Sequence, residues 1–293
     1  MIDLVELGGG LGVEVITDVG DLPLRDPTRS TSDESRHHLR APALLSQILW
    51  RPKVGAVESV LFYGLAGLAF LFSFGVREHL KSTYKHWSQI RNSTGRPGGQ
   101  VARMILDANR LQAVPVEPVR GNLTDHYDPR HKALRLAADN FVGNSVAAMA
   151  VAAHECGHAL QDADGYRPME FRTAMVPIAN AGARFGLPLA IYGSLSGSVV
   201  MVQIGTLGYL AAILLTFLTL PVEFNASKRA LGQLDRLGLI SADGREGAEK
   251  VLRAAAMTYV AGVASSAWYL LYLVFAGGRA LFRRPKPPLP PAL

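Results

Sequence analysis

Charged residues are scarce in this chain of 293 residues, and their absence is unevenly distributed. Asp, Glu, Lys and Arg make up 18% of the sequence and apolar residues 49%, whereas an ordinary soluble domain carries about 25% charged residues. Disorder requires low hydrophobicity and high charge, so the composition excludes a largely disordered chain. It also argues against a simple soluble enzyme, because contiguous gaps in charge are typical of membrane spans.

Cysteine is nearly absent as well, since Cys156 stands alone. One thiol cannot form an intramolecular disulfide, and it excludes a Cys-rich zinc finger or an iron–sulfur cluster. We expect Cys156 to be a small buried thiol rather than a redox switch. The net charge of +6 is modest, and no basic stripe with interleaved aromatic residues is present, so nucleic acid is not a predicted partner.

The missing charge is concentrated in three apolar stretches. The middle one, 185–222, contains no charged residue in 38 positions, and its centre is rich in Gly and Ser. A membrane-spanning helix needs about 20 mostly apolar residues, so this stretch is interpreted as a hairpin of two short spans. The other two stretches supply one span each. The four predicted spans are 57–76, 185–201, 204–221 and 254–278.

The remaining segments are assigned around these spans. Residues 1–50 are interpreted as a poorly ordered tail outside the fold, and 279–293 as a Pro-rich basic tail. A catalytic domain over 77–184 and a helical region over 222–253 form the soluble part. Lys and Arg residues are more numerous beside the span ends on this side, which predicts a cytoplasmic catalytic domain in a multi-pass protein of the cell membrane.

Within the soluble part the pattern predicts a few local elements. Residues 98–112 have an apolar stripe at helical spacing, and 145–161 are Ala-rich and strongly helical. Pro and Gly residues between 115 and 121 indicate an irregular or extended region, and the alternation over 132–137 predicts a short strand. The fold class is therefore mainly α, with about four transmembrane helices and a small α+β domain.

The residues His154-Glu155-Cys156-Gly157-His158 lie on the predicted helix 145–161. Histidines at positions i and i+4 share one helical face, so both imidazoles can bind one zinc ion. Glu155 then faces a metal-bound water and can act as the general base. The alternative, two unrelated surface histidines, fits poorly with the apolar run that precedes them.

A third ligand has two candidates. Asp164 stands where a metzincin would have its third histidine, and Glu223 is the first charge after the long uncharged stretch. We favour Glu223, because two intervening spans return the chain to the membrane face of His158. We expect Pro221 to lie in the first turn of a new helix that carries Glu223. The alternative for Glu223 is an acid at the N-terminus of this helix, favoured by the helix dipole.

Three segments resemble the YugP-like neutral zinc metallopeptidases of bacterial membranes. They are HECGHALQDADGYRPMEFRTAMVPIAN, LTDHYDPRHKALRLAADN and TLPVEFNASKRALGQL, and the resemblance covers about 80–270. It implies a membrane-bound endopeptidase of gluzincin type with one zinc ion, ligands His154, His158 and Glu223, and base Glu155. HtpX-type proteases are similar, with Glu-x-x-x-Asp after the spans. Here the position four after Glu223 is Ser227, so Asn225 or Ser227 would support the ligands.

Four further polar side chains have both a functional and a purely structural interpretation. His126 and Tyr127 belong to a turn-like segment that we place beside the site, where either could contact substrate or transition state. By analogy with gluzincins, the strand 132–137 would pair with an extended substrate. Tyr259 is a donor for the developing oxyanion or an interfacial aromatic residue. Asp162 orients a ligand imidazole or is an acid at a helix end.

The sequence thus predicts a membrane-bound zinc-dependent endopeptidase whose partners are the lipid bilayer and protein or peptide substrates, membrane proteins among them. The alternative is a non-catalytic membrane scaffold with a structural zinc site, which would be closed by four protein ligands. A zinc transporter is disfavoured, because the candidate ligands lie outside the predicted spans.

Overall fold

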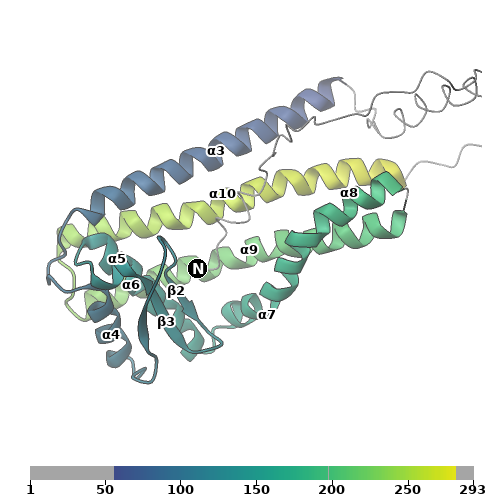
Figure 1. The fold of residues 1–293 in the computed structure, drawn as a ribbon. Helices are drawn as coiled ribbons and strands as arrows, with labels where there is room; N and C mark the ends of the chain where they lie inside the picture. Colours follow the sequence, from purple (N-terminus) through teal and green to yellow (C-terminus); the bar gives the residue numbers. More distant parts are fainter. Residues whose placement is uncertain (1–55, 197, 282–293) are drawn as a thin grey trace, which may run out of the picture.

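The structure is a computed structural model that describes residues 56–196 and 198–281 (Figure 1). The predictions for residues 1–50 and for the Pro-rich tail beyond residue 281 fall outside the described residues. The described chain is mainly helical with one small sheet. The sheet and the shorter helices form a compact part at one end of the molecule, and long helices extend from it in one direction (Figure 1).

Twelve elements are described. Two predicted helices and the predicted strand are confirmed, although the helix predicted over 98–112 already ends at Ala108. In chain order the elements are α3 (Ala56–Ser88), α4 (Gly98–Ala108), β1 (Val116–Val119), β2 (His126–Asp128), β3 (Ala133–Ala137), α5 (Ala138–Val142), α6 (Val146–Ala163), α7 (Arg167–Ala181), the π-helix η2 (Gly182–Gly186), α8 (Leu187–Ser196), α9 (Val199–Arg236) and α10 (Ala242–Leu281).

The sheet has the strand order β1-β3-β2. β1 runs parallel to β3 with Val116 opposite Leu134, and β2 runs antiparallel to β3 with Tyr127 opposite the same Leu134. Both edges of β3 are therefore paired. The prediction that strand 132–137 offers an edge to substrate is wrong for this reason, and within the described sheet β2 and β1 carry the outer edges. The region around Pro118, predicted as irregular or extended, is the edge strand β1.

α6 forms the centre of the compact part. Ser145 begins it as an N-cap, with its side chain accepting a hydrogen bond from the Ala148 N–H. Most of α6 is buried, and its alanines allow α4 and α9 to approach closely. The closest approach is at Gly157, where a Cβ atom would overlap the carbonyl oxygen of Ala226 in α9. Gly157 is therefore required for the contact between these two helices.

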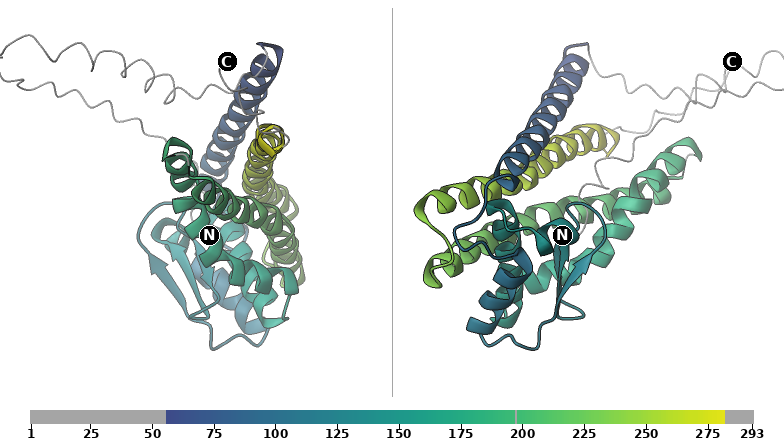
Figure 2. Two further views of the ribbon diagram at one scale, coloured as in Figure 1. Left: turned by 90° about the vertical axis from the view of Figure 1, so that its right-hand side faces the viewer. Right: turned by 60° about the vertical axis from the view of Figure 1, so that its left-hand side comes forward.

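The long helices lie in two pairs. α3 packs along α10, and the segment α7–η2–α8 packs along α9 (Figures 1 and 2). The hydroxyls of Ser73 and Ser265 lie 2.9 Å apart and link the first pair. The second pair is joined through glycines, since a Cβ at Gly182 would overlap the carbonyl oxygen of Gly208. Small residues at such contacts are typical of helices that pack within membranes.

The prediction of four spans is supported for two helices. Among the described residues, the helices long and apolar enough to cross a membrane are Arg167–Gly193 and Val200–Arg236. The segments 57–76 and 254–278 are helical, within α3 and α10, but do not join this pair. The hairpin is present, but α8 ends at Ser196 and α9 begins at Val199, so the two helices meet earlier than the predicted break at 202–203. α7, η2 and α8 follow one another without a break across the predicted domain boundary at 184.

Pro221 lies inside α9 and does not begin a new helix. One continuous helix of 38 residues therefore carries both the apolar stretch of the third predicted span and Glu223. The rotation of Glu223 about the helix axis is then set by the packing of the whole of α9 against α6 and α7.

We predict that Gly182→Ala disrupts the packing between η2 and α9. Forcing a methyl group against a backbone carbonyl costs about 1–3 kcal/mol, so the thermal midpoint in detergent should fall. Gly64→Ala is the matched control, because no atom lies within 4 Å of a Cβ built at Gly64 and alanine favours a helix. Equal midpoints for the two variants would contradict the close contact.

Candidate metal centre and active site

Two helices bring His154, His158 and Glu223 together. The histidines lie one turn apart on α6, with ring centroids 4.8 Å apart and ring planes nearly perpendicular. Their Nε2 atoms lie 3.1 Å and 3.5 Å from the same carboxylate oxygen, Oε2 of Glu223 on α9. One donor atom from each residue falls in a group within 4.8 Å. Among the described residues, this group of nitrogen and oxygen donors is the one that could hold a metal ion.

The orientation of His158 is fixed by Gln161, which is fully buried. The Gln161 amide nitrogen donates to the Val222 carbonyl at 2.8 Å and to Asn225 Oδ1 at 3.0 Å. Its Oε1 atom is left as an acceptor 3.0 Å from Nδ1 of His158. The proton of His158 therefore lies on Nδ1, and the lone pair of Nε2 faces Glu223.

His154 has an equivalent partner in Ser227, whose hydroxyl lies 3.2 Å from Nδ1. Ser227, at the position four residues after Glu223, therefore lies behind the imidazole of a candidate ligand. Asn225 acts one step further out, since its Oδ1 accepts from Gln161 and from Arg229 Nε at 2.8 Å. Such outer partners orient metal ligands and raise their basicity.

Glu155 lies between the two histidines and is 2% exposed. Its Oε2 atom accepts a hydrogen bond of 3.0 Å from the backbone N–H of Tyr127 in β2. The N–H and C=O of one residue in a strand point to the same side of that strand. Because the Tyr127 N–H bonds to Glu155, the backbone of Tyr127 points away from β3 and toward α6. The outer edge of β2 therefore lies beside the candidate general base.

Carboxylates hold β2 in this place. Asp125 is buried and accepts from the Ala137 N–H and from the Asn140 side chain. Burial, and then the negative charge of Glu155, raises the pKa of Asp125. At the other end of β2, burial alone would raise the pKa of Asp128, but hydrogen bonds from His131 and Arg135 lower it. Asp128 is therefore a charged anchor of the strand.

Several side chains that the sequence analysis placed at the site form bonds around β2 rather than with His154, His158 or Glu223. The Tyr127 hydroxyl donates to Asp162 at 2.6 Å, and Lys132 forms an ion pair with the same carboxylate. The prediction that Asp162 orients an imidazole is therefore wrong, because Gln161 holds that position. The His126 ring is bonded at Nδ1 to the Thr124 carbonyl.

Asp164 and Cys156 also find other surroundings. Asp164 forms an ion pair with Arg229, so the structure brings Glu223, and not Asp164, to the histidines. Cys156 is buried with its thiol 3.5 Å from the Ala102 carbonyl, and burial raises its pKa. The expected small buried thiol is confirmed.

The sequence did not point to Arg172 or Gln161, and the interfacial interpretation of Tyr259 is wrong. Tyr259 is 5% exposed and interacts with the Glu223 carboxylate, so it is not an exposed aromatic residue of the membrane interface. A terminal nitrogen of Arg172, on α7, lies 3.7 Å from Oε1 of Glu223. A glutamine three residues after the second histidine could have been noticed, because i and i+3 share a helical face.

The residues present fit a zinc ion. Both histidines have Nδ1 hydrogen-bonded and Nε2 directed at one carboxylate, as ligation through Nε2 requires. Two imidazoles and one carboxylate are a donor set found at catalytic zinc sites. Among the described residues no fourth His, Cys, Asp or Glu joins the group, which leaves a coordination position for water or substrate.

Comparisons with known proteins agree with this class. The model of the family described as "Putative neutral zinc metallopeptidase" matches residues 62–277. The chain is also 41% identical, over 222 residues, to "Putative membrane protease YugP" of Bacillus subtilis (strain 168). The aligned region covers 75% of this chain and 99% of that relative. No solved structure matches the chain. The chain therefore belongs to this family of neutral zinc metallopeptidases, as its sequence motifs indicated.

We predict that Gln161→Met weakens zinc binding about 10- to 100-fold, because the loss of an outer partner costs that much at other zinc sites. The variant keeps the side-chain volume but removes the acceptor on His158. Competition with a fluorescent chelator measures the affinity. Gln112→Met, at an exposed glutamine, is the control and should match the wild type; equal affinity for Gln161→Met would contradict the assigned role.

Proposed function

We propose that this protein is a membrane-bound zinc-dependent endopeptidase of gluzincin type with one zinc site per chain. The observation that carries the proposal is the convergence of His154, His158 and Glu223, with Glu155 beside them and the edge of β2 alongside. A group built only to hold a metal would not need a second buried carboxylate that is hydrogen-bonded to a strand edge.

Each residue has a defined task in this proposal. His154, His158 and Glu223 hold the zinc, which supplies Lewis-acid activation of water and of the scissile carbonyl. Glu155 accepts the proton of the attacking water and returns it to the leaving amine. The Tyr127 N–H orients the Glu155 carboxylate before substrate binds. Arg172 and Tyr259 lie against Glu223 and hold this buried carboxylate in place.

The substrate lies along the outer edge of β2. An extended peptide can add a strand to an open edge, gaining main-chain hydrogen bonds that do not depend on sequence. The edge at Tyr127 is next to Glu155, so an added strand would carry its peptide bonds past the general base. We therefore propose unfolded or extended protein segments as substrates, including those of membrane proteins.

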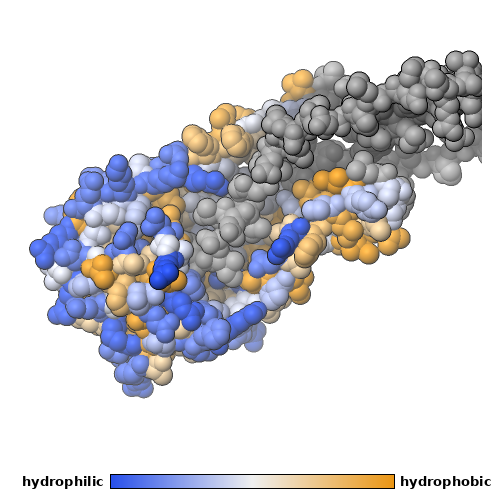
Figure 3. Space-filling view, viewed as in Figure 1, coloured by the Kyte–Doolittle hydropathy of each residue, from blue (hydrophilic) through white to orange (hydrophobic). Residues whose placement is uncertain are grey.

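Membrane attachment through four helices is part of the proposal. Besides the two apolar helices of the hairpin, α3 exposes many large apolar side chains, among them Val60, Tyr63, Leu68, Phe70 and Phe74 with exposed fractions of 57–72%. In Figure 3 apolar residues are prominent on the extending helices and polar residues on the compact part. Exposed apolar surface on this scale is unfavourable in water and favours contact with lipid.

The alternative of a non-catalytic scaffold with structural zinc has less support. A structural site is closed by four protein ligands, and the described residues supply three. Asp164, the candidate for a fourth, is paired with Arg229 instead.

We predict that Glu155→Gln lowers hydrolysis of a fluorescently labelled unfolded protein by at least about 100-fold, because a general base contributes 10²–10⁴-fold. Zinc content, measured by atomic emission, should stay near that of the wild type. Glu78→Gln, at an exposed acid paired with Lys81, should change neither quantity. A Glu155→Gln variant with wild-type turnover would refute the mechanism, and an inactive wild type that retains zinc would favour the scaffold.

The catalytic side is proposed to face the cytoplasm. Because the protein has one cysteine, Cys156, this orientation can be tested by labelling single introduced cysteines. In a Cys156→Ala background, Asp235→Cys should react with a membrane-impermeant maleimide only after cells are permeabilised, because Asp235 is exposed and follows the predicted span 204–221 on the catalytic side. Ser198→Cys, at the hairpin turn, should react in intact cells. The reverse labelling pattern would place the site on the outer face.

A further inference from the structure

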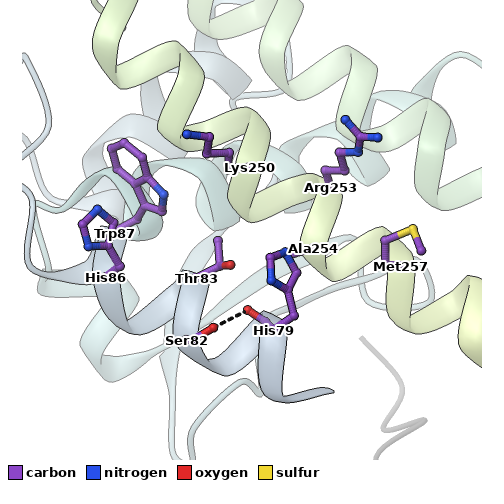
Figure 4. Close-up of a pocket in the computed structure, with 9 residues that line it drawn as sticks. All are labelled: His79, Ser82, Thr83, His86, Trp87, Lys250, Arg253, Ala254 and Met257. Carbon is purple, nitrogen blue, oxygen red and sulfur yellow. Dashed lines mark hydrogen bonds between the residues drawn. The ribbon is translucent and has the colours of Figure 1, made fainter. Parts of the chain in front are cut away.

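A second feature of interest is a cavity of about 570 Å³ between α3 and α10 (Figure 4). None of its lining residues belongs to the candidate metal site. Figure 4 shows its walls, with His79, His86 and Trp87 on α3 and Lys250, Arg253 and Met257 on α10. The cavity therefore combines cationic and titratable nitrogen groups with an aromatic ring and a thioether.

The cationic groups of the cavity have few acidic partners. Lys250 pairs with Glu246 one turn earlier on α10, and both side chains are largely exposed. Among the described residues, no acidic side chain pairs with Arg253, and none contacts the rings of His79 or His86. An exposed pair such as Lys250–Glu246 has little energy, so the cavity presents a net positive charge to a ligand.

Trp87 is held in the wall of the cavity by specific contacts with both helices. The Trp87 indole packs directly on Gly247 of α10, where a Cβ would overlap the ring. Lys250 Nζ lies 5.9 Å from the centre of the same indole, and His86 meets Trp87 edge to face at 5.1 Å. The glycine thus lets the large aromatic ring lie between the helices and hold two polar side chains at the rim.

The position of the cavity along the chain matches the edge of a bilayer, and this step rests on the proposed four-span arrangement. Arg77 is the first charge after the apolar segment 57–76, and Arg253 is the last charge before the uncharged segment 254–278. The lining residues 79–87 and 250–257 therefore lie at the depth of lipid headgroups, where Trp and basic residues gather.

We propose that this cavity binds the phosphate of an anionic phospholipid, with Arg253 and Lys250 as the cationic groups. Arg253 donates to the phosphate oxygens, the hydroxyls of Ser82 and Thr83 lie in the same wall, and Met257 contacts the start of an acyl chain. A phosphate held by both helices would fix α3 against α10 and so set the height of the compact part above the bilayer.

The test uses the purified full-length protein in neutral detergent and native mass spectrometry with dioleoyl-phosphatidylglycerol, dioleoyl-phosphatidylcholine or glycerol 3-phosphate. We expect the anionic lipid to bind more tightly than the other two. Arg253→Gln should weaken its binding about fivefold, the effect of one basic residue near an anionic lipid surface. Arg253→Lys should retain most of the affinity.

Lys81→Gln is the matched control, since Lys81 is an exposed base on α3 that does not line the cavity, and it should change binding less than twofold. Equal binding of the two lipids, or equal losses in Arg253→Gln and Lys81→Gln, would overturn the proposal. Glycerol 3-phosphate binding as tightly as the lipid would overturn the assignment to lipid. Because the readout needs no catalysis, failure here is separate from failure of the peptidase assay, and carbonate extraction tests the membrane attachment independently.

Discussion

The contact between α6 and α9 at Gly157 is the constraint on which the candidate active site depends. α6 carries both histidines and Glu155, and α9 carries Glu223. The helices can approach so closely because residue 157 has no side chain where the Ala226 carbonyl lies. A methyl group here would move α9 outward, and Glu223 would leave the Nε2 atoms. The metal centre is thus a consequence of backbone packing before it is a matter of ligand chemistry.

Burial of so many polar groups at this contact is costly unless each is paired. Glu223 is 3% exposed and is surrounded by the two histidines, Arg172 and Tyr259. Behind them, Gln161 uses both ends of its amide. Among the described side chains, no buried nitrogen or oxygen lacks a hydrogen-bond partner. The network therefore fixes the directions of the candidate ligands and leaves few buried polar groups unpaired, which is the preorganisation that the proposed catalysis would need.

Prediction from the sequence succeeded where the signal is local. The helix that carries His154 and His158 follows from its alanines, and β3 follows from its alternation. Prediction failed where a partner distant in sequence decides. Tyr259 lies 36 positions after Glu223 and only the fold brings them together. Pro221 is tolerated inside α9 because tertiary packing outweighs its local preference. β3 is central because β1 arrives from the other side.

The sequence by itself determined the candidate metal-ligand pair, the candidate general base and the apolar segments, because helical periodicity and hydrophobicity are properties of neighbouring residues. It also pointed to Glu223 through the spacing of the uncharged stretch. Only the tertiary structure decided that Gln161 rather than Asp162 orients His158, that Arg172 lies against Glu223, and that β2 rather than β3 has its edge beside Glu155. Those choices depend on how helices rotate and strands order against one another, and such relations between distant segments have no local pattern.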